Sequence, residues 1–174
     1  MEDVERLFRL YHAPLVRYLT RRLGDRDWAE EIAQETFLRA LRQETISSER
    51  SWLFAVATNL VRDDARKQSR QRKHLELLRA EAEVAQANVE IEPTSLERDE
   101  ERALARQAVE SLAERDRLAL LMREEGLDYA EIAEALDLSP GSVGTTLSRA
   151  RRRLVESYEA LQKARETREK NAAS

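Results

Sequence analysis

Apolar side chains recur at helical spacing from the start of the chain, which predicts a first helix over VERLFRLYHAPLVRYLTRRL. Pro14 lies within this stretch and predicts a break or a new first turn, because proline lacks the backbone donor that a helix interior uses. Gly24 predicts the end of the pattern. The positions expected to face inward are Val4, Leu7, Leu10, Tyr11, Leu15 and Leu19.

Two further helices are predicted before residue 75. The stretch DWAEEIAQETFLRAL is the first of them, with Asp27 as its expected N-cap and Glu30 completing a capping box. A polar connection, QETISSER, separates it from SWLFAVATNLVRDDARKQSRQRK, which is apolar at its start and basic at its end. The inward positions expected in the earlier helix are Ala29, Ile32, Ala33, Phe37, Ala40 and Leu41.

An acidic stretch that contains Pro93, NVEIEPTSLERDEE, interrupts the helical pattern in the middle of the chain. We expect a flexible linker at about residues 86–96, so that the two halves move independently. Thr94 or Ser95 is the expected N-cap of the helix that follows. The predicted division is a first domain at 1–75, a linker at 76–96, a second domain at 97–160 and a fraying polar tail at 161–174.

The second domain contains the most specific local pattern, DYAEIAEALDLSPGSVGTTLSRARRRL. Gly126 is expected to end the helix before it. Asp128 and Glu131 form a capping box for a short helix, and Ser139 with Pro140 begins a second one after a tight joint. This arrangement predicts a helix-turn-helix. Its inner positions are Ile132, Ala133 and Leu136 on the first helix, and Val143, Leu147, Ala150 and Leu154 on the second.

The second helix of this motif has a polar outer face. Hydroxyls and arginines suit base edges and phosphates in a DNA major groove. An alternative interpretation is an amphipathic hairpin whose arginines form a solvated surface. The outward positions are Gly144, Thr145, Ser148, Arg149, Arg151 and Arg152.

Composition supports an all-α protein. Only 4 glycines and 3 prolines occur in 174 residues, which leaves little turn chemistry for a β-sandwich or barrel. There is no cysteine, which excludes disulfides and thiolate metal sites. His12 and His74 are far apart in sequence, and we expect each to be a surface or packing residue rather than a ligand. We therefore expect no metal and no cofactor.

Charge is unevenly distributed. The net charge is −4, but acidic residues concentrate at 76–100 and separate two segments that each contain a basic cluster. No apolar run approaches the ~18 residues that span a membrane. The acidic start MEDVERLF lacks the basic region of a signal peptide. These features predict a cytoplasmic protein without membrane insertion.

Three motifs in this order resemble one family. AEEIAQETFLRAL, SWLFAVATNLVRDDARK and EGLDYAEIAEALDLSPGSVGTTLSRARRRL, with an acidic linker between the second and third, are similar to extracytoplasmic-function (ECF) sigma factors of bacterial RNA polymerase. These are the sigma-70 proteins that contain only regions 2 and 4. The resemblance covers about residues 4–75 and 97–157. It implies two small helical domains, core RNA polymerase and promoter DNA as partners, and an anti-sigma factor as regulator.

The resemblance also implies roles for particular residues in the first domain. In the family, the AEEIAQETF helix docks on core polymerase, and the WLFAVATN helix reads the −10 element as single-stranded DNA. Asn59 matches the position that holds an extruded base, and an amide offers both a donor and an acceptor to a base edge. The residues expected to bind core polymerase are Glu31, Gln34, Glu35 and Leu38. Those expected to bind −10 DNA are Asn59, Arg62, Arg66, Lys67 and Arg70, the basic ones along the phosphates.

Trp52 is expected in the core of the first domain. Leu53 stands where housekeeping sigma factors carry a second tryptophan that helps to melt DNA, so melting should depend more strictly on promoter sequence.

In the second domain, the resemblance places the second helix of the motif in the −35 major groove. Gly144 departs from the family pattern, which very often has lysine or arginine there. Glycine costs roughly 1 kcal/mol relative to alanine inside a helix. We expect it to allow the backbone to approach DNA closely, and the alternative is drift at a surface position that reads no base. The residues expected at the −35 element are Gly144, Thr145, Ser148, Arg149 and Arg152.

Three other functions are weaker interpretations. A stand-alone helix-turn-helix regulator would use residues 128–154 and leave 27–73 without a role. An enzyme lacks support, because the sequence has no glycine-rich phosphate loop, cysteine nucleophile or convincing histidine–carboxylate pair. A helical interaction module without DNA would leave the polar recognition face unexplained.

Overall fold

The computed structural model describes residues 2–65 and 93–174, and the regular structure in these ranges is entirely helical. The predicted all-α class is therefore confirmed. One helix runs over residues 49–65 and is named here the 49–65 helix. The other helices are α1 (Glu2–Leu23), α2 (Arg26–Ala40), α4 (Pro93–Glu110), α5 (Glu114–Glu124), α6 (Tyr129–Leu136) and α7 (Pro140–Ala172). Within the described residues, none of the helices has the length and apolar character needed to cross a membrane.

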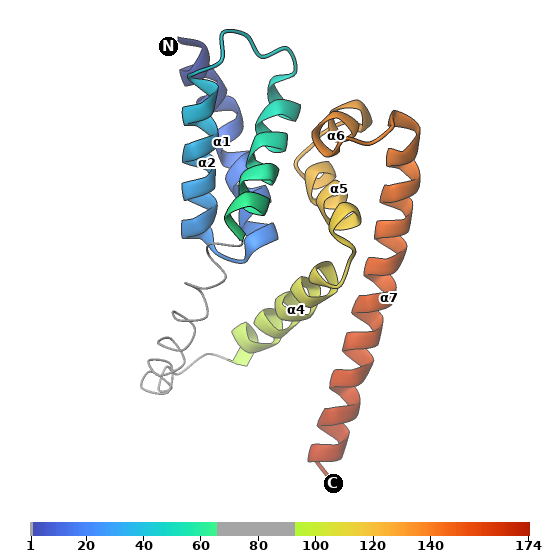
Figure 1. Cartoon of the computed structure of the whole chain (residues 1–174). Coiled ribbons are helices and arrows are strands. Elements are labelled where there is room, and N and C mark those ends of the chain that lie inside the picture. Colours follow the sequence, from blue (N-terminus) through green and yellow to red (C-terminus); the bar gives the residue numbers. More distant parts are fainter. Residues whose placement is uncertain (1, 66–92) are drawn as a thin grey trace.

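The first half of the molecule is a bundle of α1, α2 and the 49–65 helix (Figure 1). Leu15 and Leu19 of α1 are fully buried, as are Leu53 and Phe54 of the 49–65 helix. Tyr18 is also fully buried, and its hydroxyl lies 2.8 Å from the Thr58 hydroxyl. The inward positions predicted for α2 are buried from Ala29 to Ala40. Trp52 is half-buried and packs against this core, as expected.

Four local details of the first half differ from expectation, and one is the predicted inward residue Leu10, which is 52% exposed. Pro14 lies inside α1 without ending it, because buried Leu7 and Leu15 on either side fix the helix by packing, and this outweighs a local cost of ~3 kcal/mol. The N-cap of α2 is Asp25 rather than Asp27, and its carboxylate accepts the Trp28 N–H at 3.1 Å.

Leu41, predicted to face inward, is 51% exposed. It follows the last residue of α2, where the chain turns away from the bundle. Gly24 ends α1 as predicted, with a φ of 68° and its N–H bonded to the Thr20 carbonyl.

The second half is built around α5 and α6, whose ends follow the predicted capping chemistry. Gly126 has a φ of 88°, and the N–H groups of Gly126 and Leu127 bond the carbonyls of Arg123 and Met122, which is a Schellman motif. Asp128 and Glu131 form the expected capping box of α6. Ser139 is the N-cap residue of α7, as predicted, although its hydroxyl bonds Ser142 Oγ rather than a backbone N–H.

The C-terminal segment is helical, so the prediction of a fraying tail at 161–174 is wrong. α7 continues to Ala172 and packs beside α4 (Figure 1). The hydroxyls of Ser111 and Ser157 lie 2.8 Å apart, and Arg165 pairs with Glu100 at 3.6 Å. The physical reason is a half-buried stripe that continues the helical spacing of the buried residues in the first part of α7, at Leu154, Ser157, Tyr158, Leu161, Gln162 and Arg165.

The predicted linker is shorter than expected at its C-terminal end. α4 begins at Pro93, so Thr94 and Ser95 lie within the helix and neither is its N-cap. Proline suits the first turn of a helix, where its missing N–H has no partner to lose. The rest of the predicted linker lies outside the described residues.

The two halves pack against each other, unlike the independent units expected from the sequence. Most of the buried apolar residues form one cluster that continues from α1 into α5. Glu125, at the end of α5, pairs with Arg17 at 3.1 Å and Arg21 at 3.5 Å, and only 4% of its side chain is exposed. Arg50 pairs with Glu131 at 2.5 Å. Periodicity marks these side chains only as polar and does not reveal their partners.

Replacement of Glu125 by lysine should separate the two halves. The new cation would face Arg17 and Arg21, and the loss of a buried carboxylate should lower the free energy of unfolding by about 3 kcal/mol. Small-angle X-ray scattering should then show a larger radius of gyration. Glu124→Lys is the matched control, because the neighbouring Glu124 is exposed. Equal behaviour of the two variants would contradict a role for Glu125 in holding the halves together.

Candidate polymerase and nucleic-acid interface

The residues expected to contact core polymerase share the solvent face of α2. Glu31, Gln34 and Leu38 are exposed, and Glu35 is half-buried beside Arg39, whose Nε donates to its carboxylate at 3.0 Å. The structure therefore brings the four predicted residues together on one surface.

An apolar groove of about 750 Å³ adjoins this face between α1 and α2. Phe8, Leu38 and Leu41 are each about half exposed along it. Exposed apolar side chains clustered in this way mark surfaces that bind other proteins. Sequence reasoning missed Phe8 and assigned Leu41 to the core, because an apolar position at helical spacing is normally buried.

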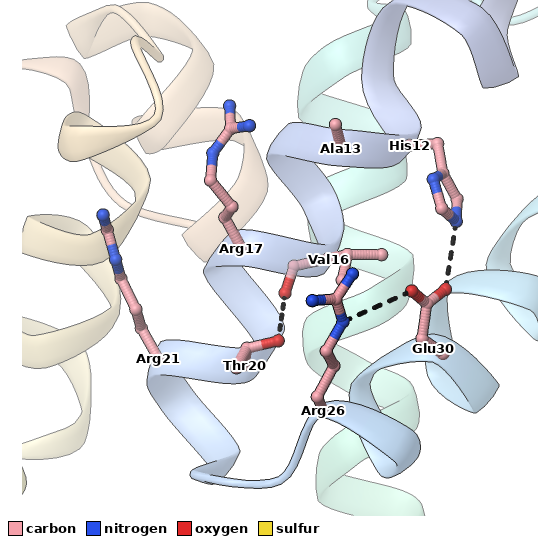
Figure 2. A pocket seen from close by; sticks show the side chains of 8 residues that line it. All are labelled: His12, Ala13, Val16, Arg17, Thr20, Arg21, Arg26 and Glu30. Carbon is pink, nitrogen blue, oxygen red and sulfur yellow. Dashed lines mark hydrogen bonds and ion pairs between the residues drawn. The ribbon is translucent and has the colours of Figure 1, made fainter.

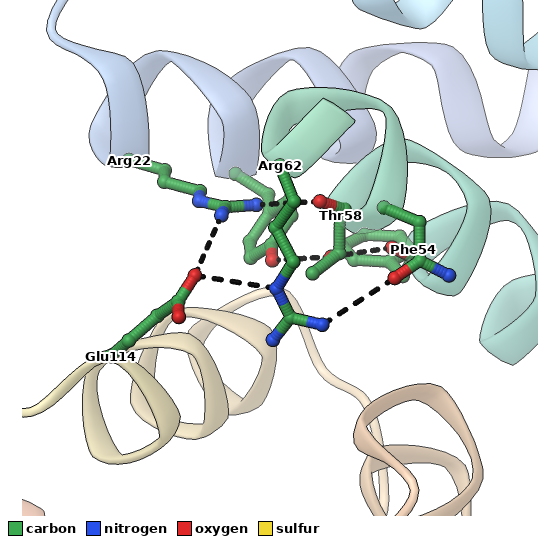
Figure 3. Close-up of polar contacts among 7 residues, drawn as sticks. Arg22, Phe54, Thr58, Arg62 and Glu114 are labelled. Carbon is green, nitrogen blue, oxygen red and sulfur yellow. Dashed lines mark hydrogen bonds and ion pairs between the residues drawn. The ribbon is translucent and has the colours of Figure 1, made fainter. Parts of the chain in front are cut away.

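The described −10 candidates, Asn59 and Arg62, lie on the exposed side of the 49–65 helix. Arg62 Nη1 donates to Asn59 Oδ1 at 3.4 Å, and Arg62 Nε donates to Glu114 Oε1 of α5, also at 3.4 Å (Figure 3). These two candidates therefore lie one helical turn apart and already interact. The other three, Arg66, Lys67 and Arg70, lie outside the described residues.

The first part of α7, residues 140–154, is the candidate DNA-recognition helix, and its predicted residues lie in two different environments. Val143, Leu147 and Ala150 are fully buried and Leu154 is half-buried, as expected for the inner face. On the opposite side, exposed polar side chains include Thr145, Ser148, Arg151 and Arg152. Gly144 and Arg149 are only half exposed, and both contact other elements.

Arg149 is bound to a buried carboxylate. Its Nε and Nη2 donate to Asp116 of α5 at distances from 2.6 to 3.2 Å, and Arg153 adds a longer contact at 3.6 Å. Asp116 is 1% exposed, and the Arg149 guanidinium holds the pKa of this carboxyl below its ordinary value. Arg149 was expected only to read DNA. The structure gives it the additional task of fixing α7 on α5.

Gly144 lies under an aromatic ring. A Cβ atom at this position would meet Tyr129 Cε2 at 3.6 Å, which is an ordinary van der Waals distance. The guanidinium of Arg123 lies 5.5 Å from the centre of the same ring. A methyl group would therefore fit beside the ring, and this contact does not require a residue smaller than alanine at position 144.

His12 of α1 is a packing residue. His12 stacks on Phe8 with ring centroids 4.3 Å apart, and its Nε2 lies 3.2 Å from Glu30 Oε2 (Figure 2). Arg26 approaches the same carboxylate at 3.9 Å beside a cavity of about 370 Å³. Across residues 2–65 and 93–174, histidine and carboxylates form no group that could hold a metal.

Comparisons with known proteins identify both halves. Residues 7–71 match the sigma-70 region 2 model, and residues 102–154 match the sigma-70 region 4 model. The RNA polymerase sigma factor YlaC of Bacillus subtilis is 32% identical over 159 residues, covering 86% of this chain and 88% of that protein. The chain belongs to the ECF class of the sigma-70 family.

Other similar proteins agree with this assignment. The ferric citrate uptake sigma factor FecI of Escherichia coli is 32% identical over 150 residues, covering 84% of this chain and 85% of FecI. The sigma factor RpoE of Bartonella quintana, solved in complex with the anti-sigma factor NepR, has the same fold with a TM-score of 0.62 at 19% identity. The superposition covers 91% of this chain and 98% of that one.

The two family matches correspond to the two halves of the structure. The region 2 match begins within α1 and spans α2, and the region 4 match begins within α4 and stops at Leu154. The last 18 residues of α7, Val155–Ala172, therefore lie beyond the matched part of this ECF sigma factor.

Replacement of Asp116 by asparagine should destabilise region 4. Loss of the charged hydrogen bonds to Arg149 should lower the free energy of unfolding by about 2 kcal/mol at pH 7. Because the folded-state pKa of Asp116 is depressed, its contribution is present above the unfolded-state pKa and is lost as the pH falls through the folded value. Urea unfolding should therefore show a difference between wild type and variant that shrinks below about pH 4. A difference that is constant from pH 7 to pH 3 would contradict this linkage.

Replacement of Gly144 by alanine should stabilise the free protein by up to about 1 kcal/mol, because alanine favours the helix and its methyl group fits beside Tyr129. Gly144→Ile should lose that gain, since a branched side chain must displace the ring. Thermal and urea unfolding compare the two variants. Gly141→Ile is the control, because nothing lies within 4 Å of a Cβ at that exposed position. If Gly144→Ile were as stable as Gly144→Ala, the ring would not constrain position 144.

Proposed function

We propose that this chain is an ECF-type sigma factor that binds core RNA polymerase and directs promoter-specific transcription initiation at −10 and −35 elements. The observation that carries the proposal is the presence of two exposed polar surfaces on one chain, each within a part that matches a sigma-70 region. One is the outer face of α2, and the other is the outer face of the recognition helix in α7.

The α2 face is the proposed contact with core polymerase. Its residues are Glu31, Gln34, Glu35 and Leu38, and the neighbouring apolar groove would extend the contact toward Phe8. Leu38 is 52% exposed, so burial on a partner would remove a large apolar side chain from water. Names of relatives such as the RNA polymerase sigma factor YlaC support this partner.

The proposed −10 contact is the exposed side of the 49–65 helix. The Asn59 amide can read a base edge, while Arg62 and the basic residues that follow it neutralise phosphates. The proposed −35 contact uses the exposed hydroxyls of Thr145 and Ser148 with Arg152. Arg149 would act mainly by positioning this helix through Asp116.

The chain is proposed to act without a cofactor, as an initiation factor rather than an enzyme, in the cytoplasm where core polymerase works. An anti-sigma factor is the proposed regulator, supported by the complex of the Bartonella quintana sigma factor with NepR. A stand-alone helix-turn-helix regulator is the weaker alternative, because it would give the α2 face and its apolar groove no partner.

Run-off transcription tests the proposal. The full chain, mixed with core polymerase, should produce discrete transcripts from a promoter library that core polymerase alone does not produce. Core polymerase pull-down in parallel separates a sigma factor from a free-standing regulator. Absence of both binding and promoter-dependent transcripts would count against a sigma role.

Leu38→Asp should weaken core polymerase binding about tenfold or more without unfolding the protein. The apolar side chain is already solvent-exposed, so a charge there costs little in the free chain and much in a buried contact. Leu10→Asp is the matched control, because Leu10 is also 52% exposed but does not line the groove. Fluorescence titration with core enzyme measures both. Unchanged affinity of Leu38→Asp would remove this face of α2 from the interface.

A further inference from the structure

Two arginines from different helices of region 2 converge on one oxygen atom. Arg22 Nη2, near the end of α1, donates to Glu114 Oε1 at 3.1 Å, and Arg62 Nε donates to the same atom at 3.4 Å (Figure 3). Glu114 belongs to the first turn of α5 in region 4. Sequence reasoning assigned no function to Arg22 or Glu114.

Arg22 is held in place by region 2 itself. Its Nη1 donates to the Thr58 carbonyl at 3.2 Å, and its side chain is only 5% exposed. The Thr58 hydroxyl donates to the Phe54 carbonyl at 2.6 Å and lies 2.8 Å from the Tyr18 hydroxyl. The residue that binds Arg22 is therefore itself held by hydrogen bonds. Burial lowers the pKa of the Arg22 guanidinium, which means that the charge is costly here without an anion beside it.

Hydrogen bonds also orient the guanidinium of Arg62. Asn59 Oδ1 accepts its Nη1 at 3.4 Å and Glu114 Oε1 accepts its Nε at 3.4 Å, so the guanidinium lies between these two side chains. The pair thus consists of one buried and one exposed guanidinium, both oriented before any ligand binds. Guanidinium groups arranged in this way suit the oxygen atoms of a phosphate.

Glu114, in contrast, is a replaceable partner. Its side chain is 49% exposed and lies on α5, which belongs to the other half of the chain. If region 4 moves away, Glu114 leaves with it, whereas Arg22 keeps its hydrogen bond to the Thr58 carbonyl within region 2 and loses its carboxylate partner. The site left behind would therefore select another anion.

We propose that Arg22 and Arg62 form a phosphate-binding site for the backbone of single-stranded DNA, and that Glu114 occupies this site in the closed chain as an internal competitor. The proposal rests on the proposed function, because it extends the −10 surface from Asn59 onto α1. The site lies one helical turn from Asn59, so a strand whose base meets the amide would have a phosphate close to the pair.

The contact of Glu114 with the two arginines makes DNA binding depend on closure, which is the packing of region 4 against region 2. The pairs of Glu125 with Arg17 and of Arg50 with Glu131 hold α5 and α6 against region 2, and so keep Glu114 in the site. A partner that separates the halves would uncover Arg22 and Arg62 together. Closure thus lowers the affinity of the free chain for single strands.

Fluorescence anisotropy with the full chain tests this site. The probe is a labelled oligothymidylate of about 15 nucleotides, long enough to follow one binding groove. Glu114→Gln should raise its affinity about three- to tenfold, because the competing carboxylate is gone while the residue keeps its size. Glu110→Gln, an exposed glutamate in α4, should leave the affinity unchanged.

Variants of the pair complete the experiment. Arg22→Gln and Arg62→Gln should each weaken binding in the Glu114→Gln background and reduce the salt dependence by about one phosphate contact, a slope of roughly 0.7. Circular dichroism checks folding, and Arg62→Gln keeps the test decisive if the buried Arg22 cannot be replaced. Unchanged affinity of Glu114→Gln, or an equal gain when Arg62 is also replaced, would overturn the proposal.

The result is separable from the test of sigma activity. If the chain fails to bind core polymerase but Glu114→Gln binds single strands more tightly through Arg62, the proposed function fails and the phosphate site stands. If promoter-dependent transcription succeeds and Glu114→Gln leaves oligothymidylate binding unchanged, only the phosphate site is refuted.

Discussion

Arginine–carboxylate pairing along α5 is the interaction on which the rest of the described structure depends. Asp116 is buried and binds Arg149, which orients the recognition helix, while Glu114 and Glu125 at the two ends of the helix bind arginines of region 2. A single helix therefore sets the position of the proposed −35 surface and the contact between the two halves. Buried carboxylates of this kind need cationic partners, because their desolvation is otherwise too costly.

This pairing explains how a chain with a net charge of −4 can carry surfaces suited to DNA. Several arginines that face region 4 are neutralised within the molecule, so they attract stray nucleic acid less than free cations would. The exposed Arg151 and Arg152 are different, because they remain on the outer face of α7. The folded chain thus presents Thr145, Ser148 and Arg152 to solvent, while it engages Arg149 with Asp116 and Arg62 with Glu114.

Local chemistry accounts for most of what could be predicted from the sequence. The capping box at Asp128, the Schellman end at Gly126 and the buried positions of the recognition helix are confirmed. Errors arose where packing overrode a local signal. Pro14 stays inside a helix, and the polar segment after Leu154 stays helical because α4 covers one side of it. Leu41 has a core-like position in the pattern, but it lies beyond the last turn of α2 and remains exposed.

The sequence by itself determined the all-helical class, the helix-turn-helix and the family, because caps, periodicity and motif order are properties of neighbouring residues. Only the tertiary structure decided which charges meet. Arg22 and Glu114 are 92 residues apart, and Arg149 and Asp116 are 33 apart. Ion pairs depend on distance and burial in space, and a chain rich in arginine and glutamate allows many pairings that local spacing cannot rank. Packing of α5 between region 2 and α7 selects one set of ion pairs. Arginines that the sequence pattern places in solvent therefore have structural roles or belong to a candidate binding site.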